Sequence, residues 1–203
     1  MNRNSALLWL PKIQSLGLPT PKTVIVPYDH RKLVAILEGE AKSNDDGGLL
    51  AITTVACSKI GYPCFIRTDL SSVKHNGPKS YKVETQQDIS RVLSRTIEDN
   101  EIKFWLEREG PQAIMVREFL NLDYSFTAFD GLPVAREWRI FSDGKKVLCF
   151  HPYWPEETIK FYGKEPKGWK TALKDHHKKP FNLGEIQQMA LQATASCGGK
   201  WSV

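Results

Sequence analysis

The residues from Ile60 to Gly77 constrain the fold of this chain more than any other stretch. Their sequence, IGYPCFIRTDLSSVKHNG, predicts a turn, a short buried strand and a polar loop, and a second strand is expected to start near Tyr81. Arg67 lies at the end of the first strand, and further donors follow in the loop: Ser71, Ser72, Lys74 and His75. Converging cationic, hydroxyl and amide donors are what a polyphosphate requires. The stretch therefore predicts a phosphate-binding hairpin.

Length and composition allow a substantial core. The chain has 203 residues, of which 41% are hydrophobic and 10% aromatic, which permits one large domain or two small lobes. No apolar run is long enough to span a bilayer, and the apolar part of the first ten residues is too short for a secretory signal. We therefore expect a cytoplasmic protein that does not enter a membrane.

The cysteines indicate neither a zinc site nor a disulfide framework. Cys57, Cys64, Cys149 and Cys197 include no pair with C-x-x-C spacing, and no histidine lies at ligand spacing from them. Free thiols in a reducing compartment are the expectation that follows.

Positive charge is concentrated near the C-terminal end. The net charge is +5, and residues 160–180 hold only two acidic residues against seven lysines: Lys160, Lys164, Lys167, Lys170, Lys174, Lys178 and Lys179. Such a segment favours an anionic partner, either a nucleotide or a nucleic acid. A solvated loop whose charges only aid solubility is the alternative.

The hydrophobic periodicity predicts a mixed α+β chain. Helices are expected over residues 5–16, 29–38, 49–60, 87–100 and 183–196. Strands are expected over residues 23–26, 64–68, 80–84, 113–119, 134–141 and 145–151, with 126–129 as a further candidate. The turn at residues 142–145 would join the later strands into one antiparallel meander. Residues 43–48 are predicted to form a flexible boundary loop.

Taken in order, these motifs resemble the ATP-grasp superfamily, and more narrowly its small, divergent members from phages and bacteria. The resemblance covers roughly residues 18–203 and rests on four segments: the lead-in at 19–23, the turn and strand at 61–67, the strand at 116–120 (VREFL) and the strand at 137–141 (EWRIF). It implies an α+β fold with mostly antiparallel sheets and packed helices, in which ATP lies between two lobes. The implied division is a lead-in segment over 1–44, a small lobe over 45–112 and a large lobe over 113–203.

The resemblance also implies an ATP site. Arg67 stands where most members have a phosphate-binding lysine, and the loop that follows, usually rich in glycine, here offers Ser71, Ser72, Lys74 and His75. A planar guanidinium with a permanent charge can serve the same purpose as the lysine. The expected adenine and ribose contacts are Glu118, Phe119, Leu120 and Asp123. The alternatives are that Arg67 is an ordinary surface ion-pair partner and that Glu118 pairs with Arg117 or Arg136.

The Glu-x-Arg strand is the implied catalytic element. Residues two apart on a strand share a face, so Glu137 and Arg139 point the same way while Trp138 faces the opposite side. In the family this arginine contacts the reacting carboxylate or phosphate, where a fixed cation stabilises developing negative charge. Arg139 is therefore the expected catalytic residue and Glu137 its support, unless the two form only a structural pair. His151 and the aromatic residues after it either line the cleft or pack in the core.

The magnesium ligands that the resemblance implies are not identified in this sequence. In the family they follow the last helix, but no carboxylate comes after Glu185, and the expected first strand of that region reaches only Val203. Mg²⁺ requires oxygen ligands, usually from one or two carboxylates and the nucleotide. We expect a clipped portion of a longer enzyme. Substitution by Glu137 or Asp130, or nucleotide binding without catalysis, are the alternatives.

The function implied by the resemblance is that of an ATP- and Mg²⁺-dependent ligase. Such enzymes phosphorylate a carboxylate, and an amine or a thiol then attacks the acylphosphate. The carboxylate and the amine are not identified by the sequence. Two alternatives come from the residues: a nucleic-acid-binding module that uses the lysine-rich segment 160–180, and a catalytically inactive nucleotide-binding protein.

Overall fold

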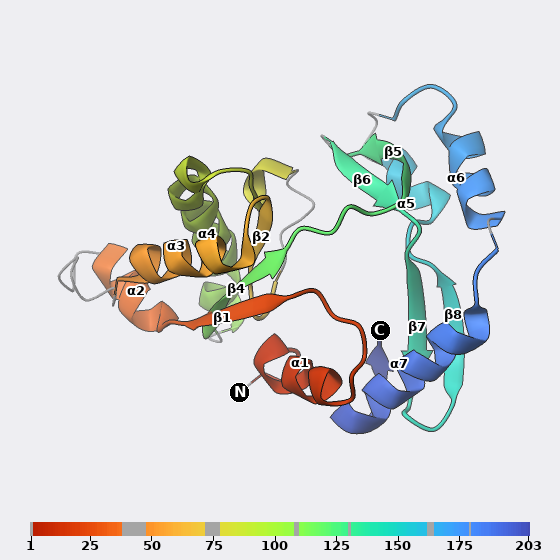
Figure 1. Ribbon diagram of the computed structural model, residues 1–203, viewed down its shortest axis with the longest axis horizontal. Helices are drawn as coiled ribbons and strands as arrows, with labels where there is room; N and C mark the ends of the chain where they lie inside the picture. The colour runs from red at the N-terminus through yellow and green to blue at the C-terminus, as the bar shows by residue number, and fades with distance from the viewer. Residues whose placement is uncertain are drawn as a thin grey trace. The chain divides into compact units, whose positions relative to one another are not determined.

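The structure, a computed structural model, describes residues 2–37, 48–71, 78–107, 110–129, 131–161, 165–178 and 180–203. The chain forms two compact units (Figure 1). The first unit comprises Met1–Leu7 and Pro21–Leu120, and the second comprises Leu8–Thr20 and Asn121–Val203. Helix α1 (Ala6–Ser15) begins in the first unit and continues in the second.

A four-stranded sheet forms the centre of the first unit. Its strands lie in the order β1-β4-β2-β3, and β4 runs antiparallel to both of its neighbours. The bounds are β1 (Thr23–Pro27), β2 (Cys64–Thr68), β3 (Lys82–Val83) and β4 (Ala113–Glu118). Strand β4, at the predicted start of the large lobe, therefore lies in the same sheet as β2, the strand of the predicted phosphate site.

Helices cover one face of this sheet and build its core. They are α2 (His30–Leu37), α3 (Leu49–Ile60) and α4 (Ile89–Glu107), with short 3₁₀ helices η3 (Pro78–Ser80) and η4 (Gln86–Asp88) before α4. Helix α3 contacts β1 and β4, and α4 contacts β2 and β3 (Figure 1). Because strand residues alternate between faces, Ile66 of β2 and Ile114 and Val116 of β4 point into this core, where all three are fully buried.

The second unit contains two smaller sheets. Strands β5 (Tyr124–Ala128) and β6 (Leu132–Ala135) pair with each other, and β8 (Val147–Pro152), β7 (Trp138–Ser142) and β9 (Trp201–Ser202) form a sheet in the order β8-β7-β9. The expectation of one strand over residues 134–141 and one meander was wrong. The chain changes partners there, since Ala135 pairs with Tyr124 whereas Trp138 pairs with Pro152.

Three helices accompany these sheets: α5 (Glu156–Phe161), α6 (Trp169–Lys178) and α7 (Leu183–Cys197). Helix α7 packs on β7 (Figure 1), where the buried hydroxyls of Ser142 and Thr194 lie 2.9 Å apart in a hydrogen bond. Ile140 of β7 is buried as well. This packing fixes which face of β7 is covered and leaves Arg139 and Phe141 on the other face, by alternation.

Most predicted elements are confirmed, including the helix at 49–60 and the strand at 64–68. Helix α4 extends seven residues beyond its predicted end at residue 100, and the return strand expected over 80–84 is reduced to Lys82–Val83. Helices α5 and α6 were not predicted, and the second of them occupies much of the lysine-rich segment that could have been a loop. Among the described residues, no helix has the length and apolar character needed to cross a bilayer.

Candidate functional site

Two arginines share one face of the sheet in the first unit. Alternation along β2 and β4 puts Arg67 and Arg117 on the face opposite α3 and α4. In the antiparallel register, Arg67 is opposite Met115 and Arg117 is opposite Phe65. The two arginines are therefore diagonal cross-strand neighbours, close enough for long side chains to interact.

The electrostatics of this pair are unfavourable without an anion. The pKa of Arg67 is lowered to about 10, first by burial and then by the charge of Arg117, with Asp69 opposing both effects. Burial also lowers the pKa of Arg117, against the opposing charge of Glu118. In the part of the chain that the structure describes, the buried Nε of Arg117 has no hydrogen-bond partner, whereas Nε of Arg67 donates to the carbonyl of Thr68 at 2.9 Å.

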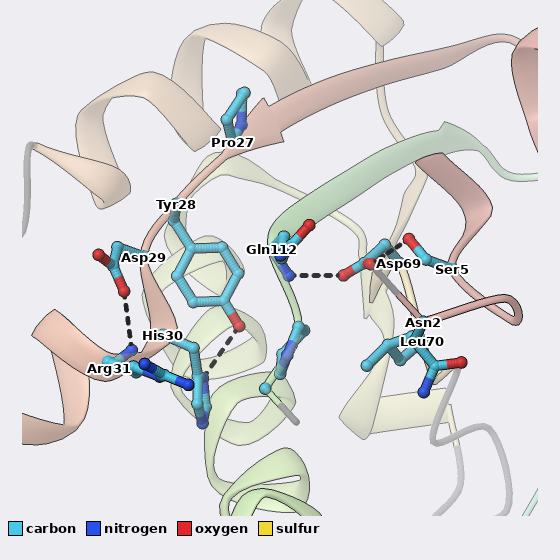
Figure 2. A pocket seen from close by; sticks show the side chains of 12 residues that line it. Asn2, Ser5, Pro27, Tyr28, Asp29, His30, Arg31, Asp69, Leu70 and Gln112 are labelled. Atoms are coloured by element: carbon cyan, nitrogen blue, oxygen red, sulfur yellow. Dashed lines mark hydrogen bonds between the residues drawn. The ribbon is translucent and has the colours of Figure 1, made fainter. Parts of the chain in front are cut away.

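Asp69, just beyond Arg67, is a structural anchor. Its carboxylate is buried and accepts hydrogen bonds from the Ser5 hydroxyl and from the backbone amide of Gln112 (Figure 2). It also accepts one from the backbone amide of Ala113. Its own backbone bonds to Ala6 and Ala113 as well. The carboxylate thus fastens the N-terminal segment and the start of β4 to the end of β2. This arrangement holds the strand end that carries Arg67.

A cavity of about 710 Å³ lies beside Asp69 within the first unit (Figure 2). Tyr28 and His30 form one side of it, with the tyrosine oxygen 3.2 Å from Nδ1 of His30. The His30 ring is almost fully buried and packs edge-to-face on Phe104, with ring centres 5.0 Å apart. Burial lowers the pKa of His30, and the opposing effect of Asp29 is smaller. This ring is therefore held neutral at pH 7.

The predicted phosphate loop is described only at its beginning. The amide of Ser71 donates to Oγ1 of Thr68 at 3.0 Å, and its carbonyl accepts from the amide of Thr68 at 3.1 Å, so the chain turns tightly after β2. Ser72, Lys74 and His75 lie outside the described residues. Their roles, and that of Ser71, remain predictions.

The predicted base and ribose residues follow β4. Glu118 accepts a hydrogen bond at 2.8 Å from the backbone amide of Lys22, and its own amide donates to the carbonyl of that residue at 2.9 Å. The ammonium of Lys82 lies 4.6 Å from the ring centre of Phe119. Leu120 is 46% exposed, and Asp123 is exposed in the second unit. The suggested pairing of Glu118 with Arg117 is seen only as a charge effect on the arginine pKa.

In the second unit, Glu137 and Arg139 have separate local partners. Oε1 of Glu137 accepts a hydrogen bond from Nε1 of the buried Trp154 at 3.2 Å. The guanidinium of Arg139 lies over the ring of Tyr153, 4.5 Å from its centre. Trp138, on the opposite face, stacks on Phe181 at 4.5 Å, as alternation predicts. Arg139 is thus a cation supported on an aromatic ring.

The described residues give less support to an anion site on the lysine-rich segment 160–180 and to a metal site. On α5 and α6, Lys170 pairs with Glu156 at 2.6 Å and Lys178 with Asp175 at 3.4 Å, so two lysines of the basic segment already have acidic partners. Across the described ranges, no group of three or more histidine, cysteine, aspartate or glutamate side chains is placed to hold a metal ion.

Sequence reasoning missed the importance of Arg117 and Asp69. The sequence did contain a signal for Arg117, because this residue lies two positions after Met115 of a predicted buried strand and next to Glu118. Its proximity to Arg67 depends on the pairing of β2 with β4, which no local pattern specifies. For Asp69 no sequence signal was available, because its partners lie about 43 and 64 residues away.

Comparison with known proteins identifies the fold. No protein-family model and no curated protein sequence matches this chain. Among solved structures, it is similar to a RimK domain protein ATP-grasp from Sphaerobacter thermophilus, with TM-score 0.51 and 11% identity over 98% of this chain and 53% of that one. It is also similar to C-terminally truncated Cdc123 from Schizosaccharomyces pombe, with TM-score 0.58 and 13% identity over 98% of this chain and 77% of that one.

At 11% and 13% identity, these similarities establish the fold but not the activity. The chain spans about half the length of the Sphaerobacter protein that it matches. Both neighbours cover nearly all of this chain, and they agree with the mixed helices and antiparallel sheets of the structure. The chain therefore has an ATP-grasp-like α+β fold.

Proposed function

We propose that this protein binds ATP and uses it to activate a carboxylate as an acylphosphate, which an amine or a thiol then attacks. The observation that carries this proposal is the pairing of Arg67 and Arg117 on one face of the sheet. Two half-buried guanidinium groups repel each other, and a bound polyphosphate would replace that repulsion with charge-assisted hydrogen bonds. The ATP-grasp-like fold supports the nature of the anion.

Arg67 and Arg117 are suited to phosphate by their chemistry. Each guanidinium offers several N–H donors in a fixed plane, which matches phosphate oxygens in bidentate fashion. Arg67 keeps one donor on the Thr68 carbonyl, which restricts its orientation, while Nε of Arg117 has no partner in the described part of the chain. In this proposal the loop donors Ser71, Ser72, Lys74 and His75 add to this pair, and the adenine and ribose contact Glu118, Phe119, Leu120 and Asp123.

Arg139 is the proposed charge-stabilising residue of the reaction. Its guanidinium is held over Tyr153, so its position is fixed without use of its N–H donors. A fixed cation favours the transition state in which negative charge accumulates on the transferred phosphoryl group. Glu137 is proposed to help position this strand through its bond to Trp154.

Magnesium is not assigned to any residue in this proposal. The described residues provide no cluster of metal-ligating side chains, and Oε1 of Glu137 is already bonded to Trp154. No step is therefore routed through a metal ion. Titration of ATP with and without Mg²⁺ measures the contribution of the metal ion to nucleotide binding.

The test has a binding stage and a reaction stage. Thermal unfolding with ATP, ADP and AMP should show stabilisation that increases with the number of phosphates, because binding to the folded state raises stability. Incubation of ATP with hydroxylamine and a panel of carboxylic acids should then release ADP and form a hydroxamate. Stabilisation by ATP without ADP release would instead favour the catalytically inactive nucleotide-binding protein. No stabilisation by any nucleotide, with or without Mg²⁺, would contradict both.

A further inference from the structure

A buried asparagine in helix α4 contacts the end of strand β2. Asn100 is only 1% exposed, although it lies in the interior of a helix, where asparagine has a low propensity. Burial of a carboxamide is unfavourable unless its donor and its acceptor are both satisfied. Its Nδ2 donates to the carbonyl of Thr96 at 2.7 Å, and its Oδ1 accepts from the hydroxyl of Thr68 at 3.3 Å. Asn100 therefore links helix α4 to the residue that follows Arg67.

The two hydrogen bonds of Asn100 fix the direction of the Thr68 hydroxyl. The Thr96 carbonyl only accepts, so Nδ2 faces it and Oδ1 is presented to Thr68, where it can only accept in turn. The Ser71 carbonyl, 3.4 Å from the same hydroxyl, already accepts from the Thr68 amide at 3.1 Å, so Asn100 is the better acceptor. Both lone pairs of the hydroxyl then accept from backbone amides, that of Leu70 at 3.3 Å and that of Ser71 at 3.0 Å.

The turn that is held in this way carries two of the groups proposed to bind phosphate. The carbonyl of Thr68 accepts from Nε of Arg67 at 2.9 Å, which restricts the guanidinium. Ser71, whose hydroxyl is one of the proposed phosphate donors, lies at the end of the turn and is half-buried. Thr68 and Asn100 are themselves buried, so they can act on a ligand only through these two residues.

We propose that Asn100 is a positioning residue for nucleotide phosphates. From α4 it directs the Thr68 hydroxyl, and that hydroxyl holds the turn that places Arg67 and Ser71. This inference deepens the proposed function, and rests on it, by assigning a residue of the helical layer to the phosphate end of the ATP site.

The expected effect is selective for the phosphate end of the ligand. Glu118, which is proposed for the ribose, pairs with Cys64 at the opposite end of β2 from Thr68. Loss of the link should therefore weaken the binding of ATP and leave the affinity for AMP, which lacks the β- and γ-phosphates, unchanged. A residue that only stabilised the fold would affect both ligands alike.

The test compares the dissociation constants of ATP and AMP for the wild type and a set of variants. Asn100→Leu removes the link, and Thr68→Val removes it from the other end while keeping the branched shape of threonine. Each should weaken ATP binding about tenfold and change AMP binding less than about twofold. Thr68→Ser retains the hydroxyl and should retain the wild-type ratio. The control, Leu93→Ala, creates a cavity beneath the same helix and should lower the melting temperature but leave the ratio unchanged.

Hydrogen exchange provides a second measurement that needs no ligand. The amide of Ser71 should exchange faster in Asn100→Leu and Thr68→Val than in the wild type and Thr68→Ser. The inference would be overturned by equal losses of ATP and AMP affinity, by an equal effect of Thr68→Ser and Thr68→Val, by a changed ratio in Leu93→Ala, or by unchanged exchange at Ser71.

The wild type separates this inference from the proposed function. ATP binding by the wild type, with the same ratio of dissociation constants in Asn100→Leu and Thr68→Val, rejects the positioning role alone. Absence of ATP binding by the wild type rejects the proposed function, and the positioning role with it.

Discussion

Burial lowers the pKa of Arg67, and the charge of Arg117 adds to this effect across the sheet that joins β2 and β4. The two side chains share a face, and in the described part of the chain neither forms an ion pair with a carboxylate. Like charges in a partly buried place raise the free energy of the folded protein. We propose that a bound anion relieves this repulsion, which the unliganded protein bears.

The first prediction concerns the protein without nucleotide. Arg117→Met should leave the free energy of unfolding unchanged or raise it by about 1 kcal/mol, since a repelling charge and an unpartnered buried N–H are removed together. Urea denaturation at low ionic strength measures the change. Arg95→Met is the matched control, because Arg95 lies exposed on α4, 3.7 Å from both Glu98 and Asp99. Loss of more than about 2 kcal/mol in Arg117→Met would show that Arg117 is a structural residue.

The second prediction concerns Asp69. Asp69→Ala should lower the stability of the first unit by about 3–5 kcal/mol, because it leaves one hydroxyl and two amide donors buried without their acceptor. Hydrogen exchange at the amide of Ala113 should accelerate in parallel with the loss measured in urea. Glu98→Ala, which removes an exposed carboxylate of the same unit, should cost less than about 0.5 kcal/mol. An equal loss in the two variants would contradict the anchoring role of Asp69.

Local patterns predicted the elements of the first unit well, and for a physical reason. Helix α3 ends at Ile60 and is followed by Gly61, which has φ of 94°, and β2 then shows strict alternation of buried and half-buried residues. Both signals lie within a few residues. The anchoring by Asp69 joins Ser5 to Gln112, and only the assembled sheet brings those residues together. Long-range pairing of this kind leaves no periodic signal in one sequence.

The third prediction concerns pH. Burial lowers the pKa of His30 in the folded protein. As the pH falls through about 6.5, the unfolded chain takes up a proton that the folded chain resists, so stability decreases. Between about pH 7 and pH 5, His30→Phe should show a weaker pH dependence of the unfolding free energy than the wild type.

A control separates this effect from other acid-sensitive groups. Asp88, Asp143 and Glu156 also have lowered pKa values, but as acids with ordinary values of 3.8 to 4.5 they act at lower pH. Asp88→Asn, which removes one of these carboxylates, should retain the pH dependence of the wild type between about pH 7 and pH 5. Identical slopes for His30→Phe and the wild type would contradict the neutral, buried state of His30.

The fourth prediction uses two glycines with nearly the same backbone. Gly144 and Gly168 have φ of 82° and 81°, where any other residue is strained. A Cβ at Gly144 would lie 3.0 Å from Cα of Ala195 in α7, whereas nothing lies within 4 Å at Gly168. Gly144→Ala should therefore cost about 1–3 kcal/mol more than Gly168→Ala. Thermal unfolding of both variants measures the difference, and equal losses would show that the β7–β8 turn does not press on α7.

The segment from Glu137 to Arg139 in the second unit was predicted only in part from the sequence. Strand alternation correctly separated Arg139 from Trp138, which the structure finds on opposite faces. The alternative that Glu137 and Arg139 form only a structural pair is not what the structure shows, because Oε1 of Glu137 bonds to Trp154, seventeen positions later, and Arg139 lies over Tyr153. Helix α6 was not predicted because its lysines make the segment strongly polar. Its buried face is formed by Leu173 and His176.

The most direct test of ATP binding by Arg67 and Arg117 is to replace each arginine with an uncharged residue and measure nucleotide affinity. Calorimetric titration of ATP, with and without Mg²⁺, should give binding to the wild type and to Arg95→Met with equal affinity. Arg67→Met and Arg117→Met should each weaken binding at least tenfold, because each loses a charge-assisted hydrogen bond worth about 1.5–3 kcal/mol. Unchanged affinity in both variants, or absence of binding in the wild type, would contradict the account.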